Sequence, residues 1–431
     1  MMTAQQEGSE LFQSFLWSLY GEEGITDTLQ KIRVKAWDRF LEIGLPTRKN
    51  DVYRYVRLHS FFAGKYESSV ATQVAAKAIS PYVLPECENS VIVFVNGHFS
   101  SSLSRLDALP KRLAVMPLVE AMNTYGSFLN NQLAKSLKEE TDPFAVINAA
   151  LHRDGVFLYL SPKTIVECPV QILNVIDADT KAMMIMPRIQ VFAGVQSELS
   201  LVSTQAVISG ENYTFNMVTD IAIEEDAHVH VTQVTKGLGD TIWHFDAVRA
   251  VQKSNSTLKT VNFTDGSATV RCDYKVTLTG ENCEASLNGV CKLIEKNEAH
   301  THVLIDHQAP HCRSIQLFKS ALNDFSHSAF EGKIYVRQAA QKTEAFQLNN
   351  NLLLSDNAKA ESKPNLEIFA DDVKASHGST VGQLDKEQIF YMKARGFTEE
   401  AAKNLLVYGF CQEVINLIKV TSLRQALTTF Q

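Results

Sequence analysis

The sequence predicts a mainly β chain in which a long block of short strands separates a mixed N-terminal region from a helical C-terminal region. From about Gly155 to Gly382, short β-branched runs follow one another and helical periodicity almost disappears. The 431 residues include only 20 Gly and 11 Pro, which is a low share for a globular chain. Sandwiches, barrels and propellers remain alternatives, but two-residue hairpins need residues with positive φ. The shortage of turn residues therefore favours a parallel β-helix, although no repeat period is evident.

Few dipeptides suit a tight hairpin turn. They are Asn96-Gly97, Asp154-Gly155, Asp265-Gly266 and Asn288-Gly289.

The N-terminal region, residues 1–152, is predicted to mix helices and strands. Apolar residues recur at helical spacing from Leu11 to Leu19 and again from Leu29 to Leu41. Ser90–Phe99 alternates and is β-branched, which predicts one strand. Pro117–His152 is helical again, with Asp142 as an N-cap before Pro143. The strand block is then residues 153–383.

Residues 384–431 are predicted to form a C-terminal helical region, with Thr398 capping its middle helix. That helix carries an apolar stripe formed by Ala402, Leu405, Leu406, Phe410, Val414, Leu417 and Ile418. Such a stripe either packs against the strand block or docks another chain.

Composition and motifs exclude several classes of function. The 48 acidic and 41 basic residues give a net charge of −7, so we expect no nucleic-acid partner. No apolar run is long enough to span a membrane and no basic leader opens the chain, which favours a cytosolic protein. The seven cysteines are scattered without a C-x-x-C pair, which indicates reduced thiols. No P-loop is present, so we expect no nucleotide on this chain.

Two segments contain candidate metal ligands. The first gathers His300, His302, His307, His311 and Cys312, and its first two histidines share one strand face. Solvent or neighbouring side chains could satisfy these histidines instead. The second segment, Leu366–Phe397, is predicted to be a strand, an acidic pair, a small-residue loop that exposes His377, and a capped helix. His377 is a candidate metal ligand or an interface residue.

Five segments spread over the whole chain carry a more specific signal. They are LPTRKNDVYRY (Leu45–Tyr55), FVNGHFS (Phe94–Ser100), NAALHRDGVFLY (Asn148–Tyr159), IDHQAPHCRSIQLFK (Ile305–Lys319) and the long stretch Phe330–Asp385. Together they resemble the SufB/SufD family of iron–sulfur cluster assembly scaffolds, with the SufD branch most similar. The chain departs from the family pattern at Val52 and Tyr53, where an acidic residue and Trp are usual.

The resemblance implies a right-handed parallel β-helix between helical ends, in the cytoplasm or a plastid. It also implies a non-catalytic subunit that pairs with SufB and docks the SufC ATPase through the C-terminal helices, so the stripe around Leu406 becomes a candidate SufC surface. His377 maps to a candidate ligand of a nascent iron–sulfur cluster at the SufB interface. Many members carry a cysteine two residues earlier, where this chain has Ala375, so that thiolate is missing.

Two other functions are compatible with the residues. Many β-helices are polysaccharide lyases or hydrolases, although this chain shows no ladder of spaced acids. A stand-alone metal-binding protein built on His300, His302, His307 and His311 would bind metal without SufB or SufC. A homodimer in the absence of SufB is a further expectation from the resemblance.

Overall fold

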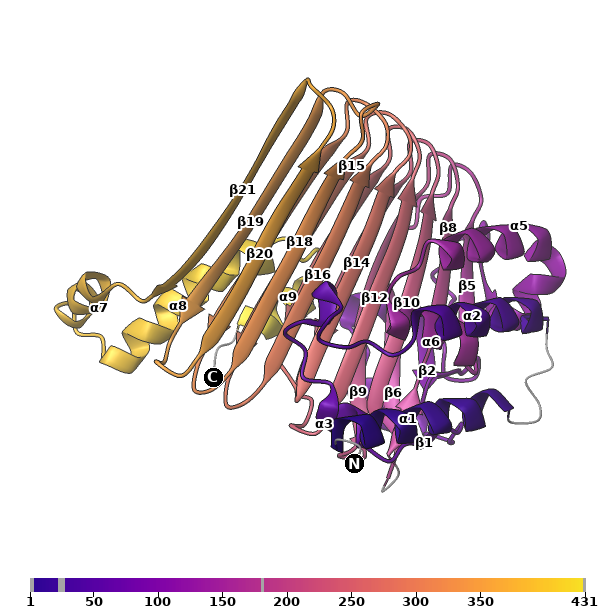
Figure 1. Ribbon diagram of the computed structural model, residues 1–431, viewed down its shortest axis with the longest axis horizontal. Helices are drawn as coiled ribbons and strands as arrows, with labels where there is room; N and C mark the ends of the chain where they lie inside the picture. Colours follow the sequence, from indigo (N-terminus) through magenta and orange to yellow (C-terminus); the bar gives the residue numbers. More distant parts are fainter. Residues whose placement is uncertain (1–3, 22–27, 180–181, 429–431) are drawn as a thin grey trace.

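The computed structural model describes residues 4–21, 28–179 and 182–428. It is a parallel β-solenoid whose chain alternates between two long sheets (Figure 1). We name the 11-stranded sheet A and the 10-stranded sheet B. The predicted mainly β fold with a parallel β-helix core is therefore confirmed.

Sheet A comprises β1 (Glu67–Ser68), β4 (Leu113–Pro117), β5 (Gly155–Leu160), β7 (Met183–Ile185), β8 (Arg188–Ala193), β10 (Thr214–Ile223), β12 (Trp243–Gln252), β14 (Thr269–Leu278), β16 (Glu298–His307), β18 (His327–Val336) and β20 (Lys359–Ile368). Sheet B comprises β2 (Val91–Val95), β3 (His98–Phe99), β6 (Val170–Asp177), β9 (Glu198–Ser209), β11 (His228–Thr235), β13 (Thr257–Thr264), β15 (Glu284–Leu293), β17 (Arg313–Leu322), β19 (Thr343–Leu353) and β21 (Val373–Gln383).

The coils of the solenoid differ in length, which explains why the sequence shows no clean repeat. The sheet A partner of Trp243 is Thr269, 26 residues on. The sheet A partner of His327 is Lys359, 32 residues on. Inward side chains alternate along each strand and stack into one apolar core between the sheets. Register is kept by this stacking and not by a fixed number of residues per coil.

One corner of the solenoid explains the low glycine count. The residues with positive φ at this corner are Lys163, Gln196, Asp226, Asn255, Asn282, His311 and Lys342. In each case the backbone N–H donates to a carbonyl of the next coil, as from Asn255 to Glu281 at 2.8 Å. Left-handed backbone is therefore supplied mainly by polar residues, of which Asn and Asp tolerate it best, and not by glycine.

Most of the N-terminal region covers the outer face of sheet A (Figure 1), whereas the segment around Ile79 packs against β2 and β6 of sheet B. Its helices are α1 (Ala4–Gly21), α2 (Gln30–Ile43), η1 (Asp51–Tyr53), α3 (His59–Phe62), α4 (Ala76–Ile79), η2 (Ser80–Tyr82), η3 (Pro85–Cys87), α5 (Leu118–Lys138) and α6 (Pro143–Leu151). Asp142 caps α6 as predicted, accepting from the Phe144 N–H at 2.9 Å. The Phe144 ring then stacks on Phe245 of β12, with centroids 3.8 Å apart.

The C-terminal helices are α7 (Lys386–Lys393), α8 (Glu399–Ile415) and α9 (Thr421–Thr428). Thr398 caps α8 as predicted, accepting from the Ala401 N–H at 3.1 Å. α8 packs on the outer face of sheet B, against β13, β15 and β17. α7 projects beyond the end of the solenoid (Figure 1). Among the described helices, none is long and apolar enough to cross a membrane.

Two local predictions are wrong. Ser90–Phe99 is not one strand but a tight hairpin, because Asn96 and Gly97 both adopt positive φ (50° and 81°) and reverse the chain between β2 and β3. The segment around His377 is not a loop but part of β21, since the edge of β19 offers a backbone partner for every residue from Val373 to Gln383. Small residues there form an edge strand instead of a turn.

Candidate functional site

The solenoid ends in a coil that has no further coil to pair with in the described part of the chain. β20 and β21 are the last strands of sheets A and B, and each pairs with a described strand on one side only. Apolar side chains remain exposed at this end, with Phe369 56% and Val381 51% exposed. Unpaired backbone groups beside exposed apolar side chains are suited to receive another chain.

His377 lies near the middle of β21 and is exposed. It is in register with Gln347 of β19, which is buried in the solenoid interior. Because paired parallel strands present side chains in register, His377 shares the inward face of the last coil. It is exposed only because nothing in the described chain closes this end. Ala375, two residues earlier, also faces inward and packs beside Ala345.

The predicted docking stripe divides into two faces. Ala402 and Val414 are both fully buried, and Val414 belongs to the apolar cluster that joins α8 to sheet B. Phe410 is half-buried, with the Lys319 ammonium 4.8 Å from its ring centroid. Leu406 is half-buried, and Leu405 is 47% exposed. Ala402 and Val414 therefore pack, and only the other side of α8 is available to a partner.

Further apolar side chains are exposed on and after α7, and Phe390 among them lines a groove between α7 and α8. Phe390 is 73% exposed, Tyr391 57% and Phe397 45%. The groove has a volume of about 890 Å³ and is lined by both helices and by residues that follow β19 and β21. The sequence stripe missed these aromatics because α7 is too short to show a clear periodicity.

The structure does not bring the predicted histidine group together. His302 lies on the outer face of sheet A and its Nδ1 is 2.8 Å from the Asp273 carboxylate. His307 is buried, with Nε2 2.9 Å from the Ser314 hydroxyl. His311 occupies the left-handed corner described above. Cys312 is buried behind it and its thiol lies 3.2 Å from the Gly280 carbonyl.

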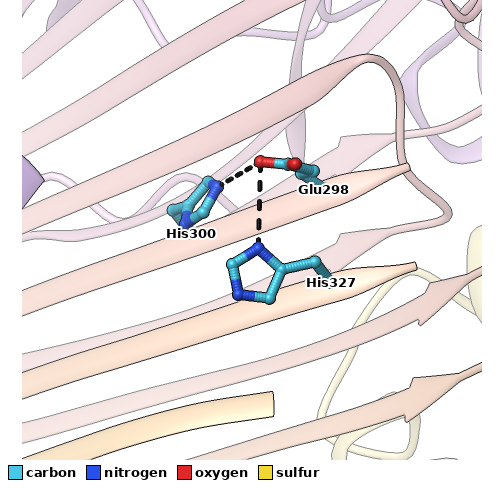
Figure 2. Close-up of side chains that lie close together, drawn as sticks. All are labelled: Glu298, His300 and His327. Atoms are coloured by element: carbon cyan, nitrogen blue, oxygen red, sulfur yellow. Dashed lines mark hydrogen bonds and ion pairs between the residues drawn. The ribbon is translucent and has the colours of Figure 1, made fainter. Parts of the chain in front are cut away.

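His300 instead joins two residues that the sequence did not single out, Glu298 and His327 (Figure 2). Glu298 Oε2 lies 3.0 Å from His300 Nε2 and 3.9 Å from His327 Nδ1. Glu298 and His327 are register partners on β16 and β18. They are 29 residues apart in the sequence, so knowledge of the coil length would have found them.

Burial and neighbouring charges shift the pKa values of all three residues in this cluster. Burial lowers the pKa of His300. Burial acts in the same direction on His327, but the nearby carboxylates of Glu298 and Glu361 raise its pKa to about 9. Burial would raise the pKa of Glu298, yet the nearby imidazoles of His300 and His327 lower it to about 2.

A buried ion network fixes the N-terminal region over sheet A. Arg249 of β12 contacts Glu140 at 2.6 Å and Asp273 at 2.8 Å. The Tyr53 hydroxyl donates to Asp142 at 2.5 Å, and Arg271 lies 4.1 Å from the Tyr53 ring centroid. Burial opposes ionisation of Asp273, but Arg249 and His302 outweigh it and hold its pKa well below the usual range. Tyr53, at a position where the chain departs from the family pattern, is part of this network.

Two family models together match almost the whole chain. The family model described as "SUF system FeS cluster assembly, SufBD core domain" matches residues 175–410, and "SufBD protein N-terminal region" matches residues 2–172. The chain belongs to the SufBD family. The expected resemblance is thus confirmed and assigns the protein to iron–sulfur cluster assembly.

Individual relatives agree with this assignment. An iron–sulfur cluster assembly SufBD family protein of Synechocystis is 27% identical over 406 residues, covering 92% of this chain and 88% of that protein. The iron–sulfur cluster assembly protein SufD of Escherichia coli is 32% identical over 218 residues, 50% of each chain. The chloroplastic protein ABCI7 of Arabidopsis thaliana is 26% identical over 423 residues, covering 94% of this chain and 86% of that protein.

Proposed function

We propose that this SufBD family protein is a SufD-like scaffold subunit without catalytic chemistry of its own. In this proposal it pairs with SufB through β20 and β21, binds the SufC ATPase through α7 and α8, and shares a nascent iron–sulfur cluster with SufB as cargo. The observation that carries the proposal is the open terminal coil, which presents an unpaired strand edge and an inward-facing, exposed His377. A partner that continued the solenoid would enclose that imidazole.

His377 is the only residue of this chain that we propose as a ligand of the cluster carried as cargo. Neutral imidazole is a ligand for iron, and Ala375 leaves no thiolate beside it. The remaining ligands in this proposal come from SufB, so the site is complete only in the complex. ATP binding by SufC would then shift the docked helices and change the SufB interface, which is a population shift between two arrangements.

The proposal is tested by co-expression with SufB and SufC, followed by size-exclusion chromatography and anaerobic absorption spectroscopy. We expect a monodisperse ternary complex. His377→Ala should retain the complex and lose most of the cluster absorbance, whereas His59→Ala, an exposed histidine on α3, should retain both. Full cluster yield with His377→Ala would remove the ligand role. Failure to form any ternary complex would contradict the scaffold role, and a homodimer alone would assign the coil to self-pairing.

The SufC surface is tested separately with Phe390→Asp. Because this side chain is 73% exposed, the change should abolish SufC co-elution without lowering the melting temperature. Leu11→Asp on α1 is the matched control, since Leu11 is 61% exposed and lies in the N-terminal region. Equal SufC binding by the Phe390→Asp variant and the wild-type chain would exclude α7 from the interface.

A further inference from the structure

The cluster formed by Glu298, His300 and His327 lies on β16 and β18, directly before β20 of the terminal coil, and none of its three residues has a part in the proposed scaffold role. We propose that it is a binding site for a first-row divalent transition cation, with Glu298 Oε2, His300 Nε2 and His327 Nδ1 as ligands. Two imidazoles and one carboxylate are a ligand set suited to such cations. The site belongs to this chain alone and needs neither SufB nor SufC.

The spacing of the ligand atoms supports this assignment. Bonds of about 2.0–2.2 Å in a tetrahedral site place neighbouring ligand atoms about 3.3–3.6 Å apart. The distances from Glu298 Oε2 to the two imidazole nitrogens, 3.0 and 3.9 Å, bracket that value. Figure 2 shows both rings turned toward the same carboxylate. Small rotations of these side chains would admit a cation between the three atoms.

Unsatisfied nitrogens provide a second, independent observation. His300 is 2% exposed and His327 5%. The Nδ1 atoms of both rings are buried and make no hydrogen bond. Buried polar atoms are normally paired. His327 Nδ1 is unpaired and points toward the Glu298 carboxylate, and a cation bound between these two atoms would satisfy it.

The surroundings orient two of the three ligands. His327 Nε2 hydrogen-bonds the Glu361 carboxylate, which leaves Nδ1 to face the site. A ligating histidine commonly donates its other ring N–H to a carboxylate in this way. Arg57 Nε lies 3.5 Å from Glu298 Oε1, so the other oxygen, Oε2, is the one that faces the imidazoles.

Position in the fold provides rigidity and access. Glu298 and His300 lie on β16, and His327 begins β18, so adjacent paired strands hold all three ligands. The Glu298 and Glu361 side chains are 12% and 34% exposed. These carboxylates connect the buried imidazoles to solvent and offer an entry route for a cation.

The same geometry would also suit a metal-free ion cluster in which protonated His327 lies between two carboxylates, and a metal titration separates the two. Full-length, tag-free protein is stripped with chelator and titrated with Co²⁺, then with Zn²⁺. We expect one Co²⁺ per chain, visible d–d absorption, and displacement by Zn²⁺. No Co²⁺ binding by the folded chain would overturn the proposal in favour of the ion cluster.

Variants locate the ion. His300→Gln, His327→Gln and Glu298→Gln should each weaken Co²⁺ binding by more than about 100-fold, because loss of an outer-shell partner alone costs about 10–100-fold. Glu361→Gln should fall in that smaller range and keep the d–d spectrum. His302→Gln is the matched control, because it lies on the same face of β16 but contacts Asp273. Circular dichroism checks that each variant is folded. The site would be overturned if folded Glu298→Gln and at least one folded histidine variant bound Co²⁺ as tightly as the wild-type chain.

Discussion

The outer face of sheet A and the terminal coil both present histidines, but in opposite settings. On sheet A, the N-terminal region covers a connected set of ionised groups, and Arg249 there is only 6% exposed. At the terminal coil, His377 is exposed on a strand whose outer edge has no partner in the described chain. The charged groups on sheet A find their partners within this chain, whereas the terminal coil offers His377 and an unpaired strand edge to another chain.

This difference separates two kinds of site within one fold. A buried cluster on paired strands can hold a small ligand without help, because the chain itself excludes water and fixes the side chains. An exposed histidine on an edge strand has one ligand atom to offer and depends on a partner for the rest. The comparison predicts that changes to the covered ion network affect the stability of the isolated chain, and that changes at His377 affect only the complex.

The largest expected effect is that of Arg249→Ala. Removing this guanidinium leaves Glu140 and Asp273 buried without their main counter-charge, and breaking a buried ion pair costs about 3–5 kcal/mol. Chemical denaturation of the isolated chain should show that loss. His377→Ala should change the free energy of unfolding by less than about 0.5 kcal/mol, as expected for an exposed position.

Arg337→Ala is the matched control for that measurement. Arg337 also makes two hydrogen bonds to one carboxylate, that of Asp306, at 3.0 and 2.7 Å. Its side chain is 52% exposed, so the loss should stay below about 1 kcal/mol. Similar losses for both arginines would show that the buried network does not hold the N-terminal region as described.

The sequence predicted the order of the main regions of the fold better than it predicted the sites. Alternating β-branched runs and the lack of glycine turns depend on local backbone preference, so the strand block from Gly155 onward could be recognised. Glu298 and His327 could not, because they meet only through the coil register. His302 and His307 are close in sequence but occupy opposite faces of β16. The alternation of side chains along a single strand could have shown this.

The next largest effect concerns pH and His307. Burial lowers the pKa of His307 to about 4, although Asp306 acts against the shift, whereas the unfolded chain titrates near 6.5. Between these values the unfolded state binds the extra proton, so stability is lost as pH falls from about 6.5 to about 4. The contribution of this one group is about 1.4 kcal/mol per pH unit, or roughly 3 kcal/mol in total.

His307→Gln should reduce that pH dependence, because glutamine can still hydrogen-bond Ser314 but does not titrate. The buried His152 and the half-buried His230 also have lowered pKa values, so some pH dependence should remain. Unfolding free energies measured at pH 4, 5, 6 and 7 give the slope for both proteins. An unchanged slope would mean that His307 is not the buried neutral imidazole that its position implies.

The smallest expected effect tests whether the corner histidine is structural. His311 has a φ of 61°, a conformation that costs a branched side chain about 1–2 kcal/mol. His311→Val should therefore destabilise the chain by about that amount, and His311→Gly should change stability by less than about 1 kcal/mol. Both variants should bind Co²⁺ like the wild-type chain, because His311 is at the corner and not in the Glu298 cluster. Loss of Co²⁺ binding in His311→Gly would show that His311 is a metal ligand, as its position in the histidine-rich segment first suggested.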